Sequence, residues 1–343
     1  MEKRKIFVIG HKNPDTDSVC SEIAYAQLKN EIDTENEYIP LRAGQTNEET
    51  QYVLKQFGVN APQYVMDVKS QVKDIEIRKV DGVDRNISIK AAWKLMRDIG
   101  VVTLPITRDN KLEGLITIAD IATSYMDVHD STTLSTARTV CKNIVETLDG
   151  ALIIGDEEHV FDRGKVLVAA ANPDLMESYI RMGDIVILGN RYESQLCAIE
   201  MQAGCIVVCE GAPVSMTIKK LAVENHCTII STPHDTFTAS RLINQSVPIS
   251  FFMRTEGLIT FSTEAYTDEV RQVMAKKRHR DFPIHDEQGN YIGMISRRNL
   301  LNMKKKQVIL VDHNEKTQAV DGIDGAEILE IIDHHRLGSL ETV

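Results

Sequence analysis

Residues 5–18 read KIFVIGHKNPDTDS, and this stretch decides the fold of the first segment. The apolar run KIFVIG is typical of a buried strand that ends at Gly10, and Asn13-Pro14 is a turn signal. Apolar residues follow at helical spacing, namely Val19, Ile23, Ala24 and Leu28. Asp17 or Ser18 is expected to cap this helix. The order strand, turn, helix is that of an α/β fold with a parallel sheet.

The same alternation continues outward along the chain. YIPLRAG and APQYVMD indicate further strands before residue 67, and QVILVD and AEILEIID indicate two more after residue 306. Between 131 and 249, four apolar runs alternate with helical patterns at 174–182, 192–202, 214–225 and 235–245. These runs are KVLVAA, DIVILG, GCIVVC and CTIIST. The fold class predicted from the pattern is α/β, with parallel sheets.

An internal repeat interrupts this pattern. Residues 103–122 read TLPITRDNKLEGLITIADIA, and residues 281–301 read DFPIHDEQGNYIGMISRRNLL. Both copies have an apolar residue before Pro, an Asp-containing turn, a Gly, two apolar residues, then Thr or Ser and a helix start. An amphipathic helix is expected before each copy. Two copies so far apart are not a solenoid, and they indicate a pair of matching modules.

Three short strings of metal-ligating residue types each follow an expected strand. They are His11-x-x-x-Asp15-x-Asp17, Asp312-His313-Asn314 and Asp333-His334-His335. In open parallel sheets, ligands bind beyond the carboxyl ends of the strands. Alternation along an extended loop would place Asp15 and Asp17 on one side, with the turn folding His11 toward them. Taken singly, the first string could be a helix cap and the second a turn; together they predict one site at one sheet edge.

The residue types of this site indicate its chemistry. Carboxylates and imidazoles without a thiolate suit a divalent cation such as Mn²⁺, Co²⁺ or Mg²⁺ rather than a structural zinc. Five candidate ligands are too many for one ion that also holds water and substrate. They suit two ions roughly 3.5–4 Å apart that clamp a phosphoryl group. The helix start adds backbone N–H donors for an anion.

Composition excludes several other classes. The 343 residues are 43% hydrophobic and 26% charged, as in soluble proteins of about two or more domains. A formal charge of −11 argues against nucleic-acid partners, because phosphate repels a net-negative surface. The six cysteines contain no Cys-x-x-Cys, which favours reduced thiols. No apolar run reaches the length of a membrane span, so a cytoplasmic protein without a membrane partner is expected.

The three strings carry a family resemblance. GHKNPDTDS (10–18), VDHNE (311–315) and IIDHHR (331–336) resemble the DHH phosphoesterase superfamily and, within it, the manganese-dependent family II inorganic pyrophosphatases. DHN as the second motif favours pyrophosphatase over the DHH exonucleases. The resemblance implies two Mn²⁺ ions, with Co²⁺ or Mg²⁺ as substitutes. Their implied ligands are His11, Asp15, Asp17, Asp312 as the bridge between both ions, and His334. His335 is implied to be catalytic and to face the substrate phosphate, with Asp333 structural.

The repeated modules resemble CBS (cystathionine-β-synthase) domains, and the region between them resembles a DRTGG-type domain. In the regulated subset of the family II pyrophosphatases, such an insert binds adenine nucleotides and adjusts activity. The resemblance implies that Thr117 offers a hydroxyl to phosphate and Asp120 a carboxylate to ribose, with helix capping as the alternative. The second copy matches less well, with Ser296 and Asn299 at these positions, and Arg297 could reach phosphate. The middle region reads GNRYES where an acidic-arginine signature is expected, so only its fold type is predicted.

The expected organisation is a discontinuous DHH catalytic domain (1–66 and 307–343), a first CBS domain (67–130), a DRTGG-like domain (131–249) and a second CBS domain (250–306). Only eight residues follow His335, whereas the family's catalytic domain continues with a further bridging Asp and a second domain. We therefore expect a C-terminally truncated enzyme that is inactive or nearly so alone.

The expected function is hydrolysis of inorganic pyrophosphate to two orthophosphates. AMP, ADP, ATP or a diadenosine polyphosphate is expected to regulate it at the CBS domains, and a homodimer is expected. Two alternatives stay open. One is an adenine-nucleotide-binding regulatory module without catalysis, and the other is a DHH phosphoesterase acting on short oligonucleotides or cyclic dinucleotides. Assays of pyrophosphate and dinucleotide turnover distinguish them.

Overall fold

The computed structural model describes residues 3–126, 130–301, 303–336, 338 and 340–343. The chain forms two compact units: unit 1 comprises Met1–Lys79 and Thr260–Val343, and unit 2 comprises Val80–Ile259. Residues 127–129, at the end of the predicted first CBS domain, lie outside the described residues. The predicted fold class, α/β with parallel sheets, is confirmed.

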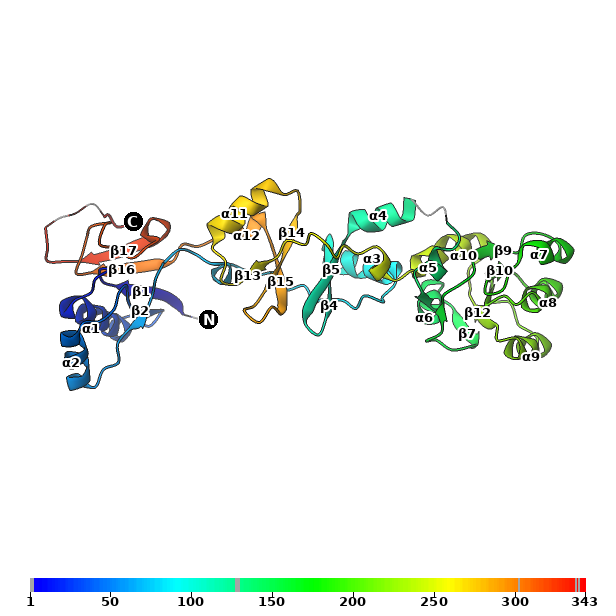
Figure 1. Ribbon diagram of the computed structural model, residues 1–343, viewed down its shortest axis with the longest axis horizontal. Coiled ribbons are helices and arrows are strands. Elements are labelled where there is room, and N and C mark those ends of the chain that lie inside the picture. Colours follow the sequence, from blue (N-terminus) through cyan, green and yellow to red (C-terminus); the bar gives the residue numbers. More distant parts are fainter. Residues whose placement is uncertain (1–2, 127–129, 302, 337, 339) are drawn as a thin grey trace. The chain divides into compact units, whose positions relative to one another are not determined.

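Unit 1 contains a five-stranded parallel sheet with the strand order β17–β16–β1–β2–β3. Figure 1 shows its blue strands, from the start of the chain, beside its orange and red strands, from the end. The strands are β1 (Arg4–Ile9), β2 (Asn36–Arg42), β3 (Gln63–Tyr64), β16 (Gln307–Val311) and β17 (Glu327–Ile332). All five residues of β16 are buried, as expected for a continuous apolar run inside a parallel sheet.

Both faces of this sheet are covered. Helix α1 (Thr16–Ile32) packs Ala26 against Ile6 and Val8 on one face. On the other face, the 3₁₀ helix η4 (Ile323–Gly325) contributes Ile323 to a core with Val308 and Leu310. Helix α2 (Glu48–Phe57) follows β2, and Gly58 ends it in the left-handed conformation. Because β1, β16 and β17 are parallel neighbours, their carboxyl ends meet at one edge of the sheet.

Helix α1 differs from its prediction in two respects. It begins at Thr16, and its cap is Asp15, whose side chain accepts from the Ser18 N–H at 3.0 Å; the predicted cap at Asp17 or Ser18 was wrong. Its buried face comprises Ser18, Val19, Glu22 and Ala26. Two of the apolar residues at helical spacing, Ala24 and Leu28, are exposed, because Ser18 and Glu22 bond the end of β1 and turn their own face of the helix toward the sheet.

The rest of unit 1 holds the second repeat. A three-stranded sheet has the order β13–β14–β15, and its β14–β15 pair is an antiparallel hairpin. Arg78 forms an ion pair of 2.8 Å with the buried Asp281 at the start of this hairpin. The elements are η1 (Val72–Asp74), β13 (Phe261–Ser262), α11 (Thr267–Lys276), β14 (Asp281–His285), β15 (Tyr291–Ser296) and α12 (Arg297–Leu301).

The first repeat lies in unit 2. Its antiparallel hairpin turns at Asp109 and Asn110, which both have positive φ, as two-residue hairpin turns require. The hairpin packs into the core of the unit through the buried side chains of Leu104, Ile106 and Ile116. The elements are α3 (Ile89–Ile99), β4 (Thr103–Arg108), β5 (Lys111–Thr117) and α4 (Ile118–Met126).

A second five-stranded sheet, with the order β7–β12–β11–β10–β9, follows in unit 2. Strands β9 to β12 are parallel, as predicted, whereas β7 joins antiparallel and was not predicted. Its strands are β7 (Ala151–Ile154), β9 (Val166–Val168), β10 (Ile185–Leu188), β11 (Cys205–Val208) and β12 (Thr228–Ser231). The flanking helices are α5 (Thr133–Thr136), α6 (Cys141–Thr147), α7 (Pro173–Tyr179), α8 (Tyr192–Glu200), α9 (Met216–Glu224) and α10 (Thr236–Leu242). The short pieces are β6 (Thr139–Val140), β8 (Val160–Phe161), η2 (Ile243–Ser246) and η3 (Ile249–Phe251).

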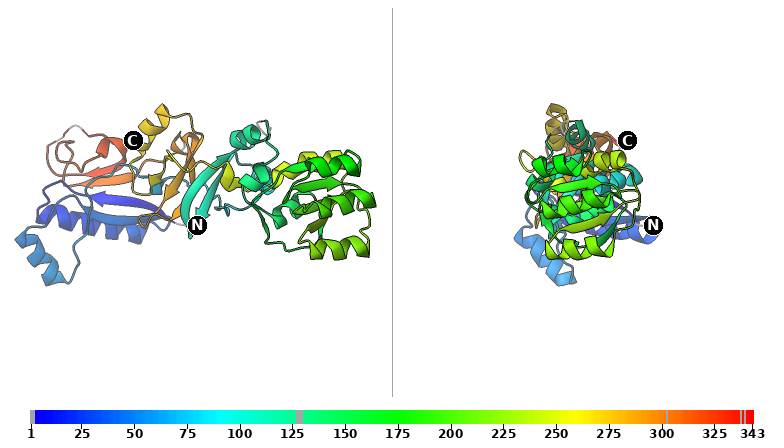
Figure 2. Two further views of the ribbon diagram at one scale, coloured as in Figure 1. Left: turned by 45° about the vertical axis from the view of Figure 1, so that its right-hand side comes forward. Right: turned by 90° about the vertical axis from the view of Figure 1, so that its right-hand side faces the viewer.

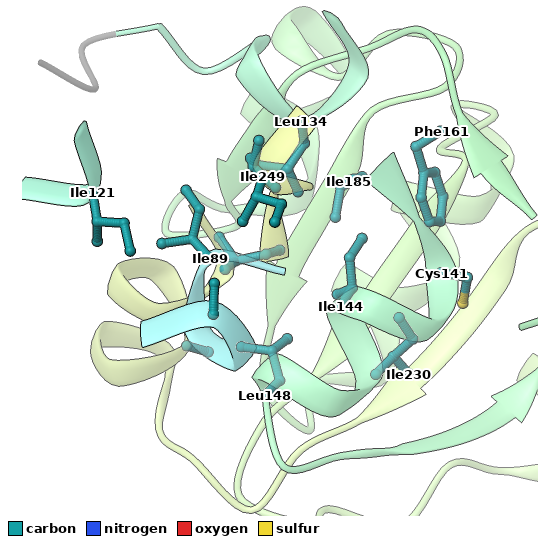
Figure 3. Packing of buried hydrophobic residues seen from close by; sticks show 14 of the residues in the cluster. Ile89, Ile121, Leu134, Cys141, Ile144, Leu148, Phe161, Ile185, Ile230 and Ile249 are labelled. Carbon is teal, nitrogen blue, oxygen red and sulfur yellow. The ribbon is translucent and has the colours of Figure 1, made fainter. Parts of the chain in front are cut away.

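Alternate residues of these strands face two cores. Val186 and Ile206 pack toward the side of α7, α8 and α9, which Figure 2 shows in green beside the sheet. On the other side, Ile185 and Ile230 pack with Ile144 of α6, as Figure 3 shows. All six cysteines are free thiols. Among the residues that the structure describes, every helix is too short or too polar to cross a bilayer.

Candidate metal centre and nucleotide corners

The three predicted strings meet at the carboxyl edge of the unit 1 sheet. His11 follows β1, Asp312 follows β16, and Asp333 follows β17. Strand β16 lies between the other two, which places Asp312 in the middle. Asp312 has a φ of 60°, a left-handed backbone that Asp tolerates better than most residues and that is often found at functional sites. Its side chain is 4% exposed.

The two carboxylate oxygens of Asp312 face different partners. Oδ2 lies 3.4 Å from His11 Nε2, which is itself 3.9 Å from Asp15 Oδ1. Oδ1 lies 3.3 Å from His334 Nε2 and 3.8 Å from His335 Nδ1. Asp17 Oδ2 lies 3.4 Å from His334 Nε2. The predicted ligands are therefore brought together in two groups that share Asp312, one with His11 and Asp15 and the other with His334 and His335, and Asp17 contacts the second group through His334.

The electrostatics of this cluster fit a bound cation. Burial raises the pKa of Asp312, and the nearby carboxylates of Asp17 and Asp15 raise it further. Its Oδ1 is buried and accepts no hydrogen bond. Three carboxylates, those of Asp312, Asp15 and Asp17, thus lie close together. Their mutual repulsion and the burial of Asp312 are unfavourable unless a positive charge lies between them. Oxygen and imidazole donors are the ligands that Mn²⁺ and Co²⁺ accept.

His335 is oriented by a chain of side chains behind it. Its Nδ1 lies 2.6 Å from Asp333 Oδ1, and this bond raises the pKa of His335. Asn314 Nδ2 donates to the other oxygen of Asp333 and, at 2.9 Å, to the carbonyl of Arg336. Burial by itself would raise the pKa of Asp333, but hydrogen bonds from the backbone and ring of His335 hold it below its usual value. The His335 side chain is 56% exposed.

His313 and Asn314 are parts of the second string for which no role was predicted. The His313 ring is buried, its Nδ1 lies 2.9 Å from the Val311 carbonyl, and burial lowers its pKa. It packs edge-on against His11, with ring centroids 6.4 Å apart. His313 therefore packs against the predicted ligand His11, and Asn314 binds Asp333 behind His335. A cavity of about 370 Å³ beside Asp312 is lined partly by Ala24 and Leu28.

The first nucleotide corner, at the β5–α4 junction, is a closed hydrogen-bonded loop. Asp120 Oδ2 accepts from the Thr117 N–H at 2.8 Å and from its hydroxyl at 2.6 Å. Asp120 Oδ1 is bound by Arg254 through Nε at 3.0 Å and Nη2 at 2.7 Å. Burial by itself would raise the pKa of Asp120, but these bonds lower it. A cavity of about 520 Å³ lies here, with Phe251 in its lining.

Arg254 is a site residue that the sequence analysis missed. It is 134 positions from Asp120 in the chain, and no local spacing signals the pair. The Thr117–Asp120 bonds are those of a helix cap, the alternative that the sequence left open, and the same Asp120 also lines the cavity.

The second corner, at the β15–α12 junction, has the same geometry with an amide in place of the carboxylate. Asn299 Oδ1 accepts from the Ser296 N–H at 2.9 Å and hydroxyl at 2.8 Å, while Nδ2 donates to the Glu76 carbonyl at 2.9 Å. Arg297 instead donates to carbonyls at the end of α11, including that of His279 at 3.0 Å. Its predicted phosphate contact stays a prediction. Arg298 and Lys304 are the basic side chains that line a cavity of about 400 Å³ at this corner.

Family models match two kinds of domain in the chain. The CBS domain matches residues 72–127 and 250–306, and the DRTGG domain matches residues 143–246. The CBS matches contain both corners, and the DRTGG match covers most of the second sheet of unit 2.

Two relatives align with almost the whole chain. The cobalt-dependent inorganic pyrophosphatase of Clostridium perfringens is 42% identical over 342 residues, and the probable manganese-dependent inorganic pyrophosphatase of Thermotoga maritima is 35% identical over 339 residues. Each alignment covers 99% of this chain and 62% of the relative, so the chain spans less than two thirds of their length.

A solved structure covers the domains between the sheet-edge motifs. It contains the CBS and DRTGG domains of the regulatory region of Clostridium perfringens pyrophosphatase, complexed with the activator diadenosine tetraphosphate. It is 36% identical, with a TM-score of 0.64, over 66% of this chain and all of that chain.

Fold, cluster and matched domains together define an α/β protein with a carboxylate–histidine cluster at a parallel-sheet edge and with CBS and DRTGG domains inserted between its motifs. The resemblance inferred from the motifs is confirmed. The chain belongs to the family II inorganic pyrophosphatases that contain CBS and DRTGG domains.

Proposed function

We propose that the sheet-edge cluster binds two divalent cations and serves the hydrolysis of inorganic pyrophosphate to two orthophosphates. The observation that carries the proposal is the position of Asp312. One of its oxygens lies with His11 and Asp15, and the other lies with His334. A carboxylate shared in this way suits two cations, with Asp17 beside His334 in the second group.

The residues of this chain prepare the site for an anionic substrate. Bound divalent cations supply positive charge for the phosphoryl oxygens and increase the acidity of water. His335 is held through Nδ1 by Asp333 and is partly exposed, and its raised pKa favours the protonated ring that pairs with a phosphate oxygen. The carboxylates of Asp15 and Asp17 belong to the separate groups on either side of Asp312.

The choice of metal is part of the proposal. The two relatives are named for cobalt and for manganese, respectively. Imidazole and carboxylate donors accept both ions. We propose that either Mn²⁺ or Co²⁺ occupies the cluster, with Mg²⁺ as a weaker substitute because it prefers oxygen ligands.

We also propose that adenine nucleotides regulate the protein at the CBS corners. The relative's regulatory region was solved with a diadenosine tetraphosphate activator, and it aligns with the region that holds these corners. At the first corner, Asp120 offers a carboxylate to ribose hydroxyls, Thr117 a hydroxyl, and Arg254 a guanidinium to phosphate. AMP, ADP, ATP and a diadenosine polyphosphate share these groups.

Calorimetric titration with Mn²⁺ or Co²⁺ tests the metal centre. We expect two ions per chain in the wild type and weaker, substoichiometric binding in Asp312→Asn, which keeps the shape of the side chain but lowers its charge. Glu315→Gln, outside the cluster, serves as the control. Wild-type binding of one ion or none, or an unchanged Asp312→Asn variant, would count against a shared carboxylate.

Phosphate release from pyrophosphate, with and without AMP, tests the reaction. Turnover that responds to AMP would support the proposal and contradict the expectation of an inactive chain. Metal binding without turnover agrees with that expectation, and nucleotide binding without metal binding would favour the regulatory-module alternative. The homodimer and the cytoplasmic location stay predictions, and analytical ultracentrifugation tests the first.

A further inference from the structure

The loop that carries His11 leaves the sheet at Gly10, beyond the last residue pairs of β1 with its neighbours. The Gly10 N–H donates to Glu22 Oε1 at 2.8 Å, and the His11 N–H donates to Ser18 Oγ at 3.2 Å. Ser18 and Glu22 are four residues apart on α1 and therefore lie on one face. Helix α1 thus binds two successive backbone amides at the start of the metal loop.

The fit between loop and helix is close. A Cβ at Gly10 would collide with Ser18 Oγ and lie 2.7 Å from Glu22 Oε1, so only glycine allows these contacts. The far side of the loop is also held, because the Lys12 N–H donates to the Gln318 carbonyl at 2.8 Å. His11 reaches Asp312 from a backbone that is fixed on both sides.

Glu22 is an unusual residue for this position. It is 0% exposed, and its Oε2 is buried with no hydrogen-bond partner in the described part of the chain. Burying a polar group without a partner is unfavourable, and an apolar side chain of similar size would avoid that cost. Packing of α1 on the sheet therefore does not explain Glu22. Among the residues that the structure describes, its side chain bonds to the Gly10 N–H, next to the first predicted metal ligand.

We propose that Glu22 is a positioning residue of the metal centre: through the Gly10 N–H, it fixes the backbone from which His11 faces Asp312. The inference rests on the proposed function of the cluster. It assigns to a buried carboxyl outside all three motifs a role in metal affinity. The conservative variant Glu22→Gln keeps an acceptor oxygen, whereas Glu22→Leu keeps approximate size and removes the acceptor.

The first measurement is amide hydrogen exchange of Gly10 and His11 by NMR, on the full chain without metal. We expect Glu22→Leu to lose protection at Gly10 by at least about tenfold, with protection retained in the rest of β1. Glu22→Gln is expected to retain it. Val19→Ala is the matched control, because Val19 is equally buried on the same helix and its side chain is apolar, so the substitution leaves its backbone bond to the Asp15 carbonyl in place.

The second measurement is Mn²⁺ and Co²⁺ affinity by calorimetry. We expect Glu22→Leu to bind at least about tenfold more weakly, the size typical for residues that orient metal ligands. Glu22→Gln and Val19→Ala are expected to remain close to the wild type. Ser18→Ala, a smaller change that frees the His11 amide, is the second test if Glu22→Leu does not fold, and its affinity is expected to fall as well.

The outcomes separate this proposal from the one on which it rests. Wild-type affinity in Glu22→Leu, or an equal loss in Val19→Ala, would overturn the positioning role while leaving the metal centre intact. A wild-type chain that binds neither ion would overturn both. Unchanged Gly10 protection in Glu22→Leu would overturn the contact itself, whatever the metal affinity.

Discussion

Replacing Glu22 with Gln is expected to remove a pH dependence from the stability of unit 1. Burial raises the pKa of Glu22 from 4.5 to about 8, partly opposed by the Gly10 N–H and the positive charge of Arg42. Between these two values the folded chain keeps the proton and the unfolded chain releases it. The free energy of unfolding therefore falls as the pH rises through this interval, and it has its full Glu22 contribution below pH 4.5.

The size of the effect follows from that interval. The pKa of Glu22 differs between the unfolded chain, at 4.5, and the folded chain, at about 8. At about 1.4 kcal/mol for each pH unit between these values, the free energy of unfolding changes by about 5 kcal/mol. No discount for solvent applies, because Glu22 is 0% exposed. We expect the free energy of unfolding of the wild type, minus that of Glu22→Gln, to fall by up to this amount between about pH 4 and about pH 9.

Urea unfolding followed by circular dichroism at several pH values measures this difference. The single tryptophan, Trp93, lies in unit 2, so its fluorescence identifies the transition of that unit as an internal reference. Glu31→Gln, on the exposed side of the same helix, is the control. A difference between wild type and Glu22→Gln that stays flat with pH, or one that Glu31→Gln reproduces, would refute the assignment of a buried proton to Glu22.

Three further outcomes are expected. Gly44→Ala should lower the free energy of unfolding of unit 1 by about 1–3 kcal/mol in urea, because the new Cβ would collide with the Lys12 carbonyl oxygen; an unchanged midpoint would contradict this contact. Asn299→Asp, which places a carboxylate at the second corner as in the first, should lower the free energy of unfolding of unit 1 by about 1 kcal/mol in the same assay, since the Glu76 carbonyl loses its donor. A stabilised variant would argue against that bond. In a native thiol titration with a disulfide reagent, Cys20 should react first and the other five only on unfolding, because they are buried; rapid reaction of more than one thiol would show otherwise.

The position of the predicted metal cluster could be predicted from the sequence because a parallel sheet brings the residues that follow its strands to the same edge. Each string follows an apolar run, and parallel strands bring their carboxyl ends to one edge. His11 and Asp312 are therefore neighbours in the structure although about three hundred residues separate them in the chain, and His334, on the next strand end, lies beside Asp312 as well. The strands of the DRTGG region were predictable for the same reason, since buried parallel strands are continuous apolar runs.

The remaining features depend on contacts that have no local signal. Glu22 has the helical spacing of an ordinary polar residue, and only the close approach of Gly10 shows that it is buried. Arg254 lies far from Asp120 in sequence, and the direction of Arg297 depends on carbonyls at the end of another helix. The helix cap was misplaced because several residues near Asp15 are all good caps, and the fold decides among them.

The strand order of unit 1 has a consequence for how the protein is made. Strand β1 pairs with β16 across roughly three hundred residues, and the whole of Val80–Ile259 lies between the two segments of that unit. During synthesis, β1 leaves the ribosomal tunnel long before β16 has been made. The edge of β1 that pairs with β16 therefore stays unpaired while the inserted domains are synthesised. Folding of those domains shortens the loop that the late strands must close, which lowers the entropic cost of closing it. The predicted ligands after β16 and β17 therefore join those after β1 only once the late strands have been made, and a chain whose insert misfolds is expected to leave the nascent sheet open to chaperones and proteases.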